Sequence, residues 1–72
     1  MKYRCINSFT VDRYTDDGFN TDGFVEISRD SVWERNNYTN VIGAGVHLDN
    51  TETMEWLEIS EKDLEEYFEP LN

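Results

Sequence analysis

The chain has 72 residues, a formal net charge of −10 at pH 7, 38% hydrophobic residues and 14% aromatic residues. A chain of this length buries only about 60% of its unfolded surface, which leaves room for one domain, residues 1–72, and argues against a deep enzyme cleft. The single cysteine, Cys5, excludes an internal disulfide and a multi-cysteine zinc site, so we expect a reducing, cytoplasmic location.

The first half of the chain has the pattern of strands separated by turns. Apolar and polar residues alternate over residues 2–11, which predicts a strand with a kink near Asn7. Residues 12–23 contain two Asp-Gly pairs that tolerate positive φ, so this segment is predicted to be a long loop or an irregular hairpin. Short strands are predicted over 24–28 and 31–35, with a polar turn between them.

Two further strands are predicted in the second half. The apolar run over residues 40–49 alternates so that His47 lies on the face opposite to Leu48. The paired glycines in this run indicate a bend or the close approach of another chain segment. Residues 54–59 form the last predicted strand, and because their apolar side chains occupy both faces we expect a central strand or a bulge.

The C-terminal segment has helical periodicity. Ser60 is a predicted N-cap and Pro70 is expected to end the helix, which gives a helix over 61–69. The apolar residues at helical spacing, whose face is expected to pack on the sheet, are Leu64, Tyr67, Phe68 and Leu71.

These elements predict a mainly β domain with one C-terminal α-helix. Several short strands, a long first loop and an appended helix fit a small, strongly bent barrel of the SH3-like kind. A small bent antiparallel sheet with the helix across one face fits the same pattern, so the sequence leaves both architectures open.

No catalytic, cofactor or metal site is predicted, and we expect the protein not to be an enzyme. No sequence motif places an acid or a nucleophile beside His47, so we interpret it as a surface or inter-strand histidine. Cys5 lies in the inward register of the first strand and is interpreted as a small buried hydrophobe. The acidic loop over 12–23 resembles a calcium loop, but Gly18 and Arg29 would occupy positions that require carboxylates.

Two surface features are candidates for partner binding. Residues 49–72 contain nine acids and one base, whereas residues 1–48 contain seven acids and five bases. This charge repels nucleic-acid phosphates and anionic membranes, so we expect neither as a direct partner, and it attracts a protein with a basic surface. Among the loop aromatics we expect Phe24 to pack over an open barrel end, and we leave Tyr14 and Phe19 open between packing and partner contact. The candidate partner-binding residues are Glu61, Glu65, Glu66, Glu69, Tyr14 and Phe19.

Several segments carry a resemblance to a known group of proteins. They are Lys2-Tyr3-Arg4-Cys5-Ile6, Ser31-Val32-Trp33-Glu34, Val46-His47-Leu48 and, most distinctively, Glu55-Trp56-Leu57-Glu58-Ile59-Ser60 followed by Leu64-Glu65-Glu66-Tyr67-Phe68-Glu69. Over nearly its whole length the chain resembles the small uncharacterised proteins carried by phages and prophages of Gram-positive bacteria. The resemblance implies a phage accessory protein, made in a bacterial cytoplasm, that binds and redirects or blocks a host protein. Asp30-Ser31 stands where we expect Gly-Ser, so the type of the turn before Val32 stays open.

The sequence therefore predicts a non-enzymatic interaction module that binds a protein through its acidic surface and loop aromatics. A second hypothesis is a nucleic-acid mimic that blocks a DNA- or RNA-binding enzyme such as a defence nuclease, because alternate residues of a strand lie about 6.6 Å apart, near the spacing of phosphates. A third hypothesis is a small structural or assembly protein that forms homo-oligomers through a sheet edge.

Overall fold

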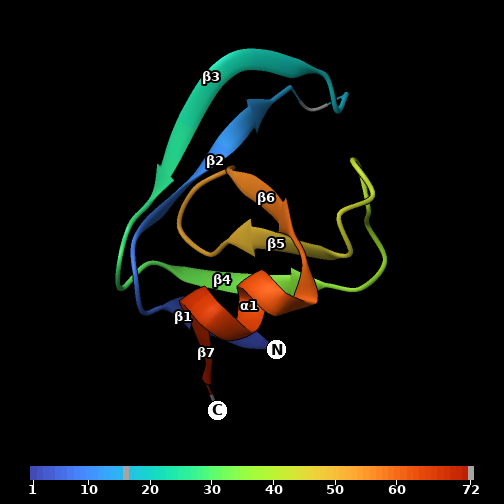
Figure 1. Cartoon of the computed structure of the whole chain (residues 1–72). Coiled ribbons are helices and arrows are strands. Elements are labelled where there is room, and N and C mark those ends of the chain that lie inside the picture. The colour runs from blue at the N-terminus through green and yellow to red at the C-terminus, as the bar shows by residue number, and fades with distance from the viewer. Residues whose placement is uncertain (16, 72) are drawn as a thin grey trace.

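A computed structural model describes residues 1–15 and 17–71 (Figure 1). In chain order its elements are β1 (Lys2–Cys5), β2 (Phe9–Tyr14), β3 (Asn20–Ile27), β4 (Val32–Asn36), β5 (Val46–Asn50), β6 (Trp56–Ile59), α1 (Glu61–Tyr67) and β7 (Phe68–Leu71). The mainly β fold with one short C-terminal helix is confirmed.

The strands form two antiparallel sheets. The larger sheet has the order β6-β5-β4-β1-β7, and β2 and β3 form a separate hairpin. Figure 1 shows this hairpin arching over the larger sheet, with β2 next to β6 and β3 outermost. The larger sheet is not closed, so of the two predicted architectures the bent open sheet, and not a closed barrel, describes the protein.

The register of the larger sheet sorts its side chains onto two faces. Tyr3 lies opposite Trp33 and Leu57 opposite Leu48, and we call the face that carries these residues the front face. The front face and the inner side of the hairpin enclose the core, and each fully buried aliphatic side chain there contributes about 1.5–3 kcal/mol. The buried cluster contains Cys5, Ile27, Trp33, Val46, Leu48, Leu57, Ile59, Leu64 and Phe68. The alternate residues, among them Arg4, His47, Glu58 and Glu69, lie on the opposite face, which we call the back face.

The predicted strand over residues 2–11 is two strands in different sheets, divided near the predicted kink at Asn7. The chain turns after Cys5 because both backbone groups of this residue are taken by the turn before β4: its N–H donates to the carbonyl of Ser31 and its carbonyl accepts from Asp30 N–H. Asp30 has a φ of 74°, in the left-handed region that favours glycine, so this position of the turn would accept glycine without strain. The interpretation of Cys5 as a buried hydrophobe is confirmed, since its side chain is fully covered.

The described residues of the acidic segment, 12–15 and 17–23, belong to the hairpin, the second of the two predicted alternatives, and residue 16 lies outside the described residues. β2 and β3 pair from Phe9 opposite Ile27 as far as Tyr14 opposite Asn20, with a bulge between Asp12 and Tyr14. The expectation that Phe24 packs inward is wrong. Phe24 lies opposite Asp12 on the outer side of the hairpin, where 72% of its surface is exposed.

The predicted strand over residues 40–49 is shorter in the structure, because β5 begins only at Val46. Gly43 and Gly45 have φ values of +79° and +119°, which break an extended strand. The N–H groups of residues 41–43 bond to the Glu58 carboxylate and not to a neighbouring strand. This loop covers the back face of β6, which explains why β6 has buried residues on both faces although it is an edge strand and not a central one.

The chain ends as a short helix followed by an unpredicted strand. Ser60 caps α1 as predicted, since its hydroxyl accepts from Asp63 N–H at 3.1 Å. The helix ends at Tyr67 and not at residue 69, because Phe68–Leu71 pairs with β1 as β7. Leu71 therefore belongs to a strand, whereas Leu64 and Phe68 are buried in the core.

Candidate functional site: an open cleft beside β6

An open hollow lies between the hairpin and β6. It has a volume of about 780 Å³ and is lined by consecutive residues of two segments, Thr10–Tyr14 on β2 and Met54–Ser60 in and around β6. Trp33 and Ile27 form part of its apolar floor. Pockets of about 300–1,000 Å³ are typical of ligand-binding sites, so the cleft is large enough to hold a small molecule or a short peptide segment.

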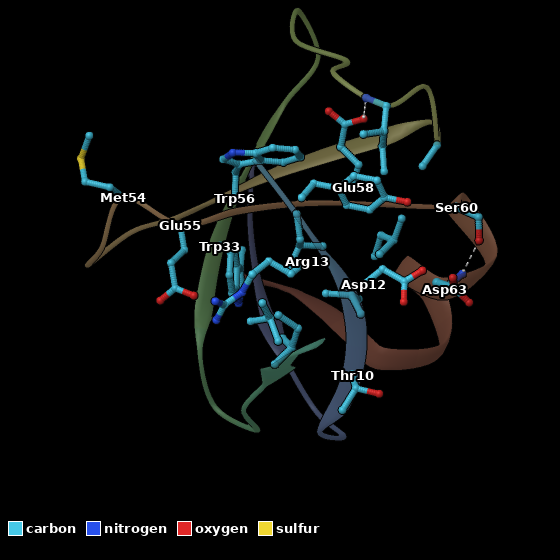
Figure 2. Close-up of a pocket in the computed structure, with 18 residues that line it drawn as sticks. Thr10, Asp12, Arg13, Trp33, Met54, Glu55, Trp56, Glu58, Ser60 and Asp63 are labelled. Atoms are coloured by element: carbon cyan, nitrogen blue, oxygen red, sulfur yellow. Dashed lines mark hydrogen bonds between the residues drawn. The ribbon is translucent and has the colours of Figure 1, made fainter. Parts of the chain in front are cut away.

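Charged side chains are unevenly placed along this cleft (Figure 2). Asp12 and Asp63 lie near one end, whereas Arg13 and Glu55 lie near the other. The first end therefore carries two carboxylates, and the second carries one charge of each sign. Because the chain as a whole is strongly acidic, the Asp12 end is the part of the cleft best suited to a cationic group.

A network of hydrogen bonds on the back face holds the cleft's upper wall. Glu58 points into the loop over residues 40–45, and its carboxylate accepts the N–H groups of Val41, Ile42 at 2.8 Å and Gly43 at 3.2 Å. Its side chain has no exposed surface. We call Glu58, its loop partners, His47 and Asp49 the Glu58 network.

His47 is the second member of this network and is 5% exposed, so the expectation of a surface position is wrong and the inter-strand position is confirmed. Nδ1 lies 2.7 Å from Oε2 of Glu58, and Nε2 lies 3.1 Å from Oδ1 of Asp49. The ring also stacks on Trp56 with the ring centres 5.4 Å apart. Since both ring nitrogens face carboxylate oxygens, only the doubly protonated imidazolium can donate to both.

The Glu58 network keeps the Glu58 carboxylate ionised. Burial alone would raise the pKa of Glu58, but the hydrogen bonds from His47, Val41 and Ile42 outweigh this and place the pKa below its ordinary value of 4.5. A carboxylate held ionised and fully covered is a poor proton donor or acceptor for an outside substrate. The network therefore fits a structural clamp on the loop better than an acid–base site.

The two predicted loop aromatics lie in different surroundings. Tyr14 is half-buried and lines the cleft, so it is placed to contact a bound partner. Phe19 lies in the turn of the hairpin and is 71% exposed. The structure thus places Tyr14 in the site and Phe19 beyond it.

The four predicted acids do not form one row. Glu61, Glu65 and Glu66 are exposed on α1, whereas Glu69 lies on β7. Two of them are in ion pairs, Glu61 with Arg35 at 2.6 Å and Glu69 with Arg4. Figure 1 shows α1 at the end of the molecule away from the hairpin turn, so the structure does not bring these acids and Phe19 together.

Sequence reasoning missed the acids that do line the cleft, Asp12, Glu55 and Asp63. It also missed Glu58, whose partner His47 is eleven residues away in the sequence. The cleft acids and the His47–Glu58 pair could have been found only from the way the strands align with one another. The alignment of β5 with β6 pairs His47 with Glu58, and the folding of the hairpin over the sheet places Asp12 near Asp63.

Comparisons with protein-family models, curated proteins and solved structures found no match to this chain. Among residues 1–15 and 17–71, no helix has the length and apolarity needed to cross a bilayer. Within the same residues no group of three or more His, Cys, Asp or Glu side chains is placed to hold a metal ion.

Proposed function

We propose that this domain is a non-enzymatic protein-binding module that takes a basic segment of another protein into the cleft beside β6. The observation that carries the proposal is the cleft itself, an opening of about 780 Å³ with an apolar floor and with Asp12 and Asp63 at one end. The resemblance to phage and prophage proteins leads us to expect an accessory protein that binds or inhibits a protein of the bacterial host.

The physical support for this proposal is the combination of apolar area with the carboxylates of Asp12 and Asp63, which form no ion pair within the described residues. Burial of apolar side chains against Trp33 and its neighbours supplies affinity, at about 25 cal/mol per Å² removed from water. The carboxylates at the rim favour a cationic partner and speed its approach, in a manner that weakens as salt is added. Glu61 and Glu69 lie outside this surface and are already in ion pairs.

The proposal can be tested by NMR titration of the labelled protein with the peptide Lys-Val-Lys-Val-Lys-Val. We expect amide shifts to concentrate at residues 10–14 and 54–60, and the matched peptide with Glu in place of Lys to cause none. Asp12→Asn should weaken binding by about two- to fivefold, the worth of a partly exposed ion pair. Glu26→Gln is the control, because it removes one exposed charge from β3 without touching the cleft. Shifts confined to α1 would contradict the proposal.

Nucleic-acid mimicry is a separate prediction that concerns α1. Glu65 and Glu66 are its exposed acids without an ion pair in the described chain, so they carry the hypothesis. Reversing both to Lys should abolish inhibition of a DNA- or RNA-binding enzyme, whereas an inhibitor that acts through the cleft would keep its potency.

A further inference from the structure

We infer that the partner segment binds as an extended strand inserted between β2 and β6, and that its side chains alternate between apolar and basic. This inference rests on the proposed function and specifies its binding mode. Three observations support it: an edge of each strand faces the cleft, backbone groups at these edges point into the cleft, and the cleft is apolar on its inner side and acidic on its outer side.

The cleft lies between two strand edges. β6 is the last strand of the larger sheet, and β2 pairs with β3 alone. Residues on one face of a strand occur at every second position, but the cleft is lined by every residue of Thr10–Tyr14 and of Met54–Ser60. Both faces of each strand therefore border the cleft, which is the geometry of an edge turned toward it.

Backbone hydrogen-bonding groups at these edges point into the cleft. In an antiparallel pair, every second residue of a strand bonds to its neighbour and the residues between them point their backbone groups away. Asn50 N–H donates to the Glu55 carbonyl, so Leu57, two residues further along, also bonds to β5. The N–H and carbonyl of Glu58 therefore point away from β5, toward the outer edge of the sheet. On the hairpin, the bond from Thr15 N–H to the Phe19 carbonyl directs the backbone groups of Tyr14 away from β3 in the same manner. No backbone bond to these groups of Tyr14 or Glu58 occurs within the described residues.

The surroundings of the cleft determine which side chains the occupant needs. A strand in this position presents alternate side chains to the core, beside Val11 and Leu57, and to the outside, beside Asp12. The inner positions require apolar residues and the outer ones favour Lys or Arg. β6 spans four residues and β2 spans six, so a partner segment of four to six residues fills the space between the two strands. Addition of a strand to an exposed edge is an established mode of peptide recognition.

The test uses the peptide Lys-Val-Lys-Val-Lys-Val and two versions of it, N-methylated on the Lys amides or on the Val amides. Each version keeps every side chain and removes the donors along one edge of the peptide. If the strand bridges β2 and β6, each version should bind at least about tenfold more weakly than the parent. On saturation with the parent peptide, hydrogen exchange of the Tyr14 and Glu58 amides should slow by at least about tenfold, whereas the Leu57 amide should change little.

The outcomes separate this inference from the proposed function. Equal binding of all three peptides would overturn strand addition while leaving the cleft as the binding site. Loss with only one methylated version would overturn bridging, because the peptide would then pair with a single edge. Failure of the parent peptide to bind would overturn the proposed function itself. A concentration-dependent dimer with Tyr14 and Glu58 amides already protected would show that the occupant is a second copy, and would overturn the assignment to a separate basic partner.

Discussion

The two faces of β6 are both buried, but by different means. On the front face Leu57 and Ile59 pack in the hydrophobic core. On the back face Glu58 is equally covered, yet it is held by hydrogen bonds to His47 and to the loop over 40–45. Apolar packing on the front fixes the sheet, whereas the charged network on the back fixes a loop that has no strand partner. The comparison shows that one strand of four residues anchors both the core and the wall of the cleft.

The largest expected effect is on the back face. Glu58→Ala should lower the free energy of unfolding by about 3–5 kcal/mol, because it removes the buried partner of His47 Nδ1 and the acceptor of the Val41 and Ile42 N–H groups, whereas Gly43 N–H keeps its bond to Asn40. Urea unfolding followed by tryptophan fluorescence measures the loss. Glu66→Gln, an exposed acid on α1, is the control and should change stability by less than about 0.5 kcal/mol. A similar small value for Glu58→Ala would contradict the role of the network.

Leu57, the neighbour of Glu58 on the front face, allows the same stability measurement for the apolar side of β6. Leu57→Ala should cost about 2–4 kcal/mol through lost burial and the cavity it leaves. The amide chemical shifts of core residues should change, whereas those of residues 41–43 should stay near their wild-type values. If those loop amides shifted as much as they do in Glu58→Ala, the two faces would not act separately.

The two faces should also differ in their response to pH. Because the pKa of Glu58 is lowered by folding, its contribution is present above its ordinary value of 4.5 and is lost as the pH falls below that value through the folded pKa. The stability difference between the wild type and Glu58→Gln should therefore shrink between pH 5 and the acid limit of folding, whereas the Leu57→Ala difference should stay constant. Urea titrations at several pH values measure both, and parallel curves for the two variants would refute the prediction.

The smallest expected effect lies outside β6, in the turn before β4. Asp30→Gly should stabilise the protein by up to about 1 kcal/mol, since the left-handed φ of 74° is strained for a side chain and free of strain for glycine. Ser28→Gly in the same turn is the matched control. Its φ is not positive, so added chain entropy alone should destabilise the protein by about 0.5–1 kcal/mol. Thermal unfolding distinguishes the two signs.

Local patterns were sufficient for some of these features and insufficient for others. Alternation and capping predicted the strand over 31–35, the start of α1 at Ser60 and the burial of Cys5, because each depends on neighbours in the sequence. The shortening of the strand over 40–49 depends on Glu58, which is contributed by a distant strand. The site acids were missed for the same reason, since the charge of residues 49–72 drew attention to α1 while the cleft is defined by how the hairpin folds over the sheet.

Pro70 has a consequence for assembly. Ile6 N–H donates to the Tyr67 carbonyl, so every second residue from Tyr67 onward, including Glu69, bonds to β1. The backbone nitrogen of Pro70, which lies between these bonded positions, therefore points toward the outer edge of the sheet. Proline has no hydrogen to donate there, so this edge is a poor template for another strand. The β7 edge of the larger sheet is therefore protected against the addition of a strand from another copy, which is one way in which proteins with open strand edges avoid aggregation.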